Sequence, residues 1–150
     1  STEDIMEKQA GKHVIKVLVA IDGSPISDLV LQHCARYAKM SGCDLTLLHV
    51  IEDIVPLSEV PNTPLRLERK KEGAKILADA ERILKDQGLE CKTLLVEGPV
   101  AQQIVNVAEE NGVDYIFMGS RGLRGIKRML LGSVADSVTR YAHCAVTIIR

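Results

Sequence analysis

The sequence contains few aromatic residues: no Trp, one Phe and three Tyr among 150 residues. Aliphatic side chains must therefore supply the core, and a chain of this length can bury one core without disulfides or metals. The formal net charge is only −1, so overall charge gives no reason to expect nucleic acid or an anionic membrane as a partner. No apolar run approaches the roughly 20 residues needed to span a bilayer.

Metal-binding and redox motifs are also missing from the sequence. The four cysteines, Cys34, Cys43, Cys91 and Cys144, form no CxxC pair, which argues against a zinc site or a thioredoxin-like motif. We expect ordinary, mostly buried thiols in a reducing cytoplasm. The Walker pattern GxxxxGK[ST] occurs nowhere in the chain, so a P-loop is not indicated.

Two segments are expected to lie outside the core. Residues 1–12 are polar and charged, unlike a secretory signal, and are predicted to form a flexible tail before a single domain over residues 13–150. Residues 51–64 include three prolines and are predicted to form a surface loop. The sequence does not decide whether this loop covers a binding site.

Strand and helix patterns alternate from residue 14 to the end of the chain. The strand-like segments are short apolar runs, typical of strands that are buried on both faces. Strands are predicted over 14–21, 44–50, 91–97, 114–118 and 144–149, and helices over 24–41, 65–87, 100–111 and 133–143. This alternation predicts a doubly wound α/β fold, a five-stranded parallel sheet with helices on both faces, and we expect the strand order 3-2-1-4-5.

A glycine-rich segment carries the strongest functional signal. Gly119-Ser120-Arg121-Gly122 directly follows a predicted strand, and Gly132-Ser133 stands nine residues later, where a predicted helix begins. Helix N-termini present unpaired N–H groups and a partial positive charge, which together bind phosphate. Glycine lets the backbone approach phosphate oxygens closely. The hydroxyl of Ser133 either adds a donor or caps the helix.

The residues between these glycines are basic. Arg121, Arg124, Lys127 and Arg128 give four cations and no acid between Gly119 and Gly132. This local excess fits a polyphosphate, although a run of charge is usually a solvated face. The glycine spacing favours the phosphate interpretation.

Asp22 is expected to stand opposite the glycine-rich segment. In an open α/β sheet, ligands bind beyond the carboxyl ends of the strands, where the strand order reverses. In the order 3-2-1-4-5 the reversal lies between the first and fourth strands, which end at Asp22 and Gly119. The carboxylate could accept hydrogen bonds from a ribose hydroxyl or a base amine, or Asp22 could simply be a turn residue before Gly23.

The chain resembles the universal stress protein family over nearly all of residues 14–150. The matching segments are KVLVAIDGS, LTLLHV, LLVEGPVAQQIVNVAEENGVDYIFMGSRG and GSVADSVTRYAHCAVTIIR. The pattern G-x2-G-x9-G-[ST] marks the ATP-binding branch of that family. It is complete here as Gly119, Gly122, Gly132 and Ser133.

The resemblance implies a nucleotide site in which Asp22 and the backbone near Val50 hold the adenosine. The glycine-rich segment would line the phosphate path. The full implied set is Ile21, Asp22, Val50, Met118, Gly119, Arg121, Gly122, Gly132, Ser133 and Val134. The implied ligand is ATP, or ADP or AMP, and any Mg²⁺ or Mn²⁺ would be carried by the nucleotide, since the sequence shows no dedicated metal cluster.

Three functions are compatible with these residues. The first is a nucleotide-binding regulator of the stress response that signals its occupancy to an unidentified protein partner. The second is a slow ATPase, which needs a general base, for which His49 and Glu97 are the only guesses. The SGGxDS pattern of ATP pyrophosphatases is missing, which argues against the interpretation of the chain as an adenylating enzyme. The third is a protein-interaction module that does not use the site.

The last predicted strand, from Cys144 to Ile149, is flat and apolar and ends one residue before the end of this sequence. An exposed edge of this kind is a template for pairing with another chain. Antiparallel pairing with a second copy about a two-fold axis would cover it, and members of the family pair in this way. We therefore expect a homodimer, with neither nucleic acid nor a membrane as partner.

Overall fold

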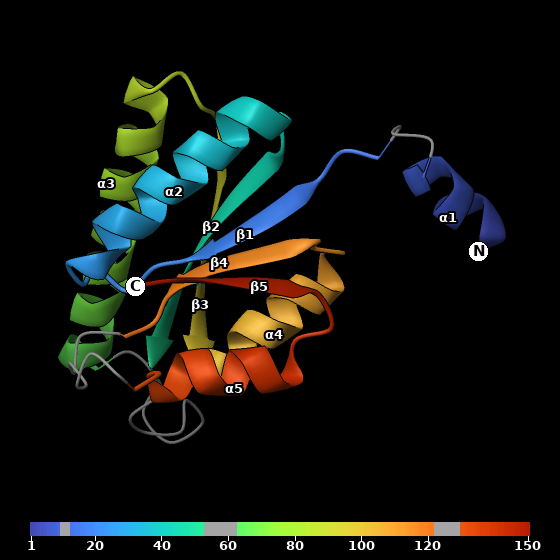
Figure 1. Ribbon diagram of the computed structural model, residues 1–150. Coiled ribbons are helices and arrows are strands. Elements are labelled where there is room, and N and C mark those ends of the chain that lie inside the picture. Colours follow the sequence, from blue (N-terminus) through green and yellow to red (C-terminus); the bar gives the residue numbers. More distant parts are fainter. Residues whose placement is uncertain (10–12, 53–62, 122–129) are drawn as a thin grey trace.

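The computed structural model describes residues 1–9, 13–52, 63–121 and 130–150. Strands and helices alternate along them after an N-terminal helix (Figure 1). The strands are β1 (Lys16–Ala20), β2 (Asp44–Glu52), β3 (Lys92–Gly98), β4 (Tyr115–Gly119) and β5 (Ala145–Ile149). The helices are α1 (Thr2–Gln9), α2 (Ile26–Ser41), α3 (Pro64–Asp86), α4 (Val100–Glu110) and α5 (Ser133–Tyr141). Every predicted strand and helix is present, with bounds that differ by one or two residues.

The five strands form one parallel sheet in the order β3-β2-β1-β4-β5, which confirms the predicted fold class. In the register of the sheet, Val19 of β1 lies between Leu47 of β2 and Phe117 of β4. The strand order reverses between β1 and β4. The segments that follow these two strands therefore diverge to opposite faces of the sheet, which opens a crevice at their carboxyl ends.

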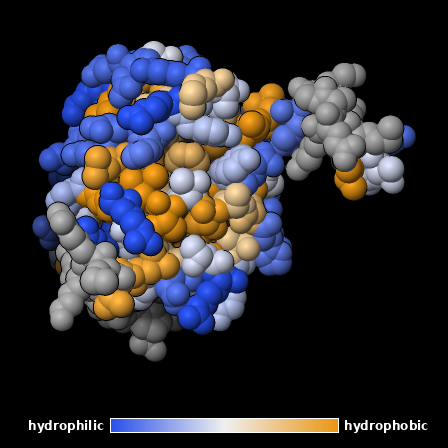
Figure 2. All heavy atoms as spheres, viewed as in Figure 1, coloured by the Kyte–Doolittle hydropathy of each residue, from blue (hydrophilic) through white to orange (hydrophobic). Residues whose placement is uncertain are grey.

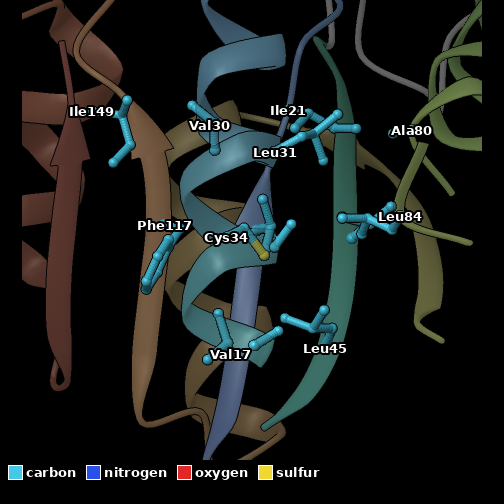
Figure 3. Close-up of a cluster of buried hydrophobic side chains, with 14 of the residues drawn as sticks. Val17, Ile21, Val30, Leu31, Cys34, Leu45, Ala80, Leu84, Phe117 and Ile149 are labelled. Atoms are coloured by element: carbon cyan, nitrogen blue, oxygen red, sulfur yellow. The ribbon is translucent and has the colours of Figure 1, made fainter. Parts of the chain in front are cut away.

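Two hydrophobic clusters fill the space between the sheet and its helices. On one face, α2 and α3 pack on the strands, and Figure 3 shows Cys34 of α2 beside Val17 of β1 and Leu45 of β2. On the other face, α4 and α5 contribute Ile104 and Val138. Because β1 sends alternate side chains to both clusters, its sequence is apolar throughout rather than alternating.

Ser24, a residue type that often caps helices, does not cap the start of α2. The helix begins at Ile26 with Pro25 before it, and no side chain caps it. The hydroxyl of Ser24 is buried and has no hydrogen-bond partner among the described residues, while the amide of Ser24 donates to the Asp22 carboxylate. At the other end, Gly42 ends the helix in a left-handed conformation, with a φ of 64°.

The N-terminal helix α1 was not expected from the sequence. The hydroxyl of Ser1 accepts a hydrogen bond from the amide of Asp4, which satisfies one of the free donors of the first turn. Figure 1 shows α1 set apart from the sheet. The flexibility of residues 1–12 stays a prediction. Most of the predicted loop at 51–64 lies outside the described residues, although its first two residues complete β2.

No described helix has both the length and the apolar composition that a membrane span requires.

Candidate functional site

A cavity of about 490 Å³ opens at the carboxyl ends of the strands, where the strand order reverses. Its walls come from the ends of β1, β2 and β4, from the first turn of α5, and from one face of α3. Nine of the ten residues that the resemblance implies line it: Ile21, Asp22, Val50, Met118, Gly119, Arg121, Gly132, Ser133 and Val134. The tenth, Gly122, lies outside the described residues, as do Arg124, Lys127 and Arg128.

The first turn of α5 gives this cavity a set of amide donors that have no acceptor among the described residues. Gly132 precedes the helix in an extended conformation, and no side chain caps it. The amide of Gly132 donates to the carbonyl of Ser120 at 2.7 Å, and the amide of Asp136 closes the first helical turn on Gly132. The amides of Ser133, Val134 and Ala135 have no intrahelical acceptor. Ser133 is the first helical residue and not the cap, so its hydroxyl is left for other partners.

The two described glycines of the motif, Gly119 and Gly132, also serve the packing of the fold. A Cβ at Gly132 would lie 2.9 Å from the carbonyl oxygen of Ser120, and one at Gly119 would lie 2.7 Å from Cγ2 of Ile26. Neither glycine has a positive φ. Sequence reasoning assigned them to a close approach of phosphate. The structure adds a second reason, because Gly119 of β4 lies too close to α2, and Gly132 before α5 too close to the backbone after β4, for a side chain at either position.

Asp22 is both a turn residue and a residue of the cavity wall. Its Oδ1 accepts hydrogen bonds from the amide of Ser24 at 2.9 Å and from the hydroxyl of Ser27 at 3.2 Å. These bonds hold the turn after β1 and fix the side chain. Oδ2 has no partner among the described residues. The turn role that the sequence left open is therefore filled by Oδ1, and the ligand role of Asp22 stays a prediction that concerns Oδ2.

The two residues considered as a general base occupy different environments. His49 lines the cavity, and its Nδ1 donates to the carbonyl oxygen of Ile21 at 2.8 Å, so a neutral ring has its lone pair on Nε2. Glu97 does not line the cavity. Its carboxylate pairs with Arg66 at 3.2 Å and with Lys70 at 3.5 Å, both on α3.

Sequence reasoning missed the wall that α3 contributes. Arg69, Glu72, Gly73 and Ile76 line the cavity from this helix. A Cβ at Gly73 would lie 2.8 Å from Leu95 and 3.0 Å from the ring of His49, so this glycine lets α3 lie close against β2 and β3. The sequence contained a signal, since positions 69, 73 and 76 share one helical face around a small residue.

The cavity walls contain no dedicated metal site in the part of the chain that the structure describes. No group of three or more His, Cys, Asp or Glu side chains there could hold an ion. The four cysteines are free thiols, one buried and three partly buried.

The parallel sheet has a crevice at the point where its strand order reverses, and a helix N-terminus without a side-chain cap and a carboxylate bound this crevice. These features define a doubly wound α/β domain with a cleft of the kind that binds ligands. The family model described as "Universal stress protein family" matches residues 14–150, and the chain belongs to this family. The universal stress protein YxiE of Bacillus subtilis is 39% identical to this chain over an alignment of 145 residues. The match covers 90% of this chain and 98% of that protein.

Solved structures of relatives agree with the fold. The structure of MJ0577, a protein of Methanocaldococcus jannaschii, has a TM-score of 0.80 and 31% identity, over 90% of this chain and 94% of that one. A universal stress protein solved in complex with cAMP has a TM-score of 0.72 and 26% identity, over 91% of this chain and 97% of that one.

Proposed function

We propose that this chain binds an adenine nucleotide in the cavity, with ATP as the first candidate and ADP or AMP as alternatives. The observation that carries the proposal is the pairing of two features in one cavity: the amides in the first turn of α5, which have no intrahelical acceptor, and the Asp22 oxygen that has no partner among the described residues. A helix N-terminus attracts a phosphate, and a free carboxylate oxygen accepts from a hydroxyl or an amine. The cAMP complex of a related protein supports the same ligand class.

The walls of the cavity suggest how the nucleotide lies. The amides of Ser133, Val134 and Ala135 would hold the phosphates, with Arg121 at the same end. Asp22 Oδ2 would accept a hydrogen bond from the ribose. The backbone of Val50, at the end of β2, would contact the base. The volume of about 490 Å³ lies within the roughly 300–1,000 Å³ typical of small-molecule sites.

A divalent cation would enter this site with the nucleotide. Mg²⁺ is commonly held by one or two carboxylates together with substrate phosphates, and the described residues contain no metal cluster of their own. Mg²⁺ or Mn²⁺ would therefore shield the phosphate charge, while the chain supplies amide and guanidinium donors. Calorimetry with and without the cation measures this contribution directly.

The test of the proposal is direct binding. Unfolding the purified protein should release an adenine nucleotide, and titration with ATP, ADP, AMP and GTP should show a preference for adenine. A protein that binds none of the adenine nucleotides at millimolar concentration would refute the proposal. That result would favour the protein-interaction module, which keeps the fold without using the site.

Slow ATP hydrolysis is the second candidate, and it requires the nucleotide to lie the other way round, with its phosphates toward His49, which lines the cavity and has one ring nitrogen without a partner among the described residues. Turnover above the buffer rate that His49→Gln abolishes would support it. Nucleotide binding with turnover equal to that of buffer would exclude it. Glu97 is a poor candidate base, since two cations of α3 hold its carboxylate outside the cavity.

As the wider role, we propose a dimeric regulatory domain of the stress response, located in the cytoplasm. The four free thiols support a reducing compartment. The dimer would pair the strands from Cys144 to Ile149 of two copies. Among the described strands, β5 lies at the edge of the sheet with β4 as its one neighbour, and Figure 2 shows hydrophobic residues gathered where β5 runs in Figure 1, between α2 and α5.

A further inference from the structure

Helix α3 runs along the cavity from the turn after β1 to the carboxyl end of β3. Ile76 lies against Gly23, 2.9 Å from where a Cβ would stand, and one turn earlier Gly73 lies against His49 of β2. One turn earlier again, Arg69 lines the cavity. Near the start of the helix, Arg66 pairs with Glu97, the last residue but one of β3. Arg69 therefore lies above the carboxyl ends of β2 and β3.

Three cations stand close together at the start of α3, and only two of them have a partner. Arg66 and Lys70 share the carboxylate of Glu97. Arg69 is half-buried in the cavity wall, yet it forms no ion pair or hydrogen bond with any residue that the structure describes. A partly desolvated guanidinium without an acceptor is costly, so its position is better suited to a ligand than to the fold.

The topology assigns Arg69 to one end of the ligand. The unpaired amides belong to α5, which packs on the face of the sheet opposite to α3. In the strand order, β4, which leads to α5, is separated from β2 by β1. The phosphate end and Arg69 therefore lie on different faces and above different strands. Arg69 lies on the same face of the sheet as the ring of His49, which faces Gly73 of α3, and near the end of β2, the strand that carries the backbone of Val50.

The chemistry of the cavity wall also favours a base contact. No Phe, Tyr or Trp lines the cavity among the described residues, so a nucleobase has no aromatic residue on which to stack. Arg69 and His49 supply the planar side chains. A guanidinium stacks on an aromatic face and donates hydrogen bonds to ring nitrogens. We propose that Arg69 contacts the base of the bound nucleotide and contributes to its selection, an inference that rests on the proposed function.

The experiment compares adenosine, which lacks phosphate, with ATP. Arg69→Gln removes the charge, and Arg69→Lys keeps the charge but removes the planar group. We expect each variant to weaken the binding of adenosine and of ATP by the same factor. For Arg69→Gln this factor is about tenfold. Arg82→Gln is the matched control on the same helix, because Arg82 is exposed, pairs with Asp79 and does not line the cavity. It should change neither affinity.

Each other outcome has a definite meaning. A loss confined to ATP would place Arg69 on the phosphates and overturn the inference. Unchanged binding of both ligands by both variants would also overturn it, while leaving the proposed function intact. A wild-type protein that binds neither ligand would refute the proposed function itself. Thermal unfolding checks the fold of each variant, and Arg69→Lys carries the test if Arg69→Gln does not fold.

Discussion

At the scale of single residues, the proposed function gives Asp22 two separable roles. Oδ1 holds the turn through Ser24 and Ser27, while Oδ2, which has no partner among the described residues, would contact the ligand. Asp22→Asn keeps one carbonyl oxygen for the turn and replaces the other oxygen with a donor. We expect adenosine affinity to fall by at least about tenfold, or about 1.4 kcal/mol, with stability within about 0.5 kcal/mol of wild type. Calorimetry and urea unfolding measure the two effects.

Asp22→Ala is the companion variant, because it removes both oxygens. It should lose the same affinity and also about 1–2 kcal/mol of stability, since the turn amide and the Ser27 hydroxyl lose their acceptor. If the Asp22→Asn variant bound adenosine as tightly as the wild type, Oδ2 would not contact the ligand.

The burial of Cys34 makes the stability of the fold depend on pH. Burial raises the pKa of this thiol to about 12, with smaller contributions from Cys43 and Cys91, against about 8.5 for an unfolded cysteine. Between these two pH values the Cys34 thiol is ionised in the unfolded chain but protonated in the folded one. Its contribution to the free energy of unfolding is therefore fully present below about pH 8.5 and is lost as the pH rises toward 12. Urea unfolding from pH 7 to 10.5 should show a shallower decline for Cys34→Ala than for wild type. Equal slopes would contradict this.

At the scale of secondary-structure elements, the contact between β4 and α2 depends on Gly119. Gly119→Ala should cost about 1–3 kcal/mol of stability, because the new methyl group meets Ile26 of α2. Truncating that neighbour, in the double variant Gly119→Ala with Ile26→Ala, should recover part of the cost. A double-mutant cycle measured by urea unfolding gives the coupling, and strict additivity would show that the two side chains do not compete for this space.

Helix α3 is anchored to β3 by a shielded ion pair, and the same helix supplies an exposed pair for comparison. The Arg66–Glu97 and Arg82–Asp79 contacts both measure 3.2 Å, but side-chain exposure is 23% and 15% in the first and 69% and 46% in the second. Glu97→Gln should cost about 1–3 kcal/mol, because Arg66 keeps a partly buried charge without its counter-charge.

Arg82→Gln should cost under about 0.5 kcal/mol, since water and salt screen the exposed pair. Urea unfolding of both variants measures the difference. Equal costs for the two substitutions would mean that burial does not control the strength of these pairs.

The sequence predicted elements better than it predicted how they meet. The strands, the helices and their order follow from apolar runs such as the one centred on Leu18, because two-sided burial leaves few topologies. The position of Arg69 was not foreseen, because it depends on how closely α3 approaches β2 at Gly73, and that distance is a tertiary property. Likewise, Ser24 resembles a cap in sequence, but Asp22 takes its amide in the turn.

At the scale of the whole molecule, the two edges of the sheet are unequal. β3 ends the sheet on one side with an exposed Lys92 and with Glu97 held by α3, and charged side chains on an edge discourage pairing with another chain. β5 ends it on the other side, and its five residues, AVTII, carry no charge. The asymmetry favours association through β5 alone, which gives a closed pair rather than a chain of copies.

The backbone of β5 shows which residues would pair. The amide of Ala145 donates to Asp114 and the carbonyl of Ile149 accepts from Ser120, so alternate residues face β4. The N–H and C=O groups of Val146 and Ile148 therefore point to the free edge. Val146→Pro removes a donor from that edge without breaking a bond to β4 and should give a folded monomer.

Thr147→Pro is the matched control for this dimer prediction, because its amide faces β4. It should lower stability through the lost sheet bond, whereas Val146→Pro should act mainly on association. Light scattering at micromolar concentration should give twice the chain mass for the wild type and the single mass for Val146→Pro. A wild-type monomer, or a Val146→Pro protein that stays dimeric, would show that β5 does not pair with a second copy, and the hydrophobic surface over it would then need another partner.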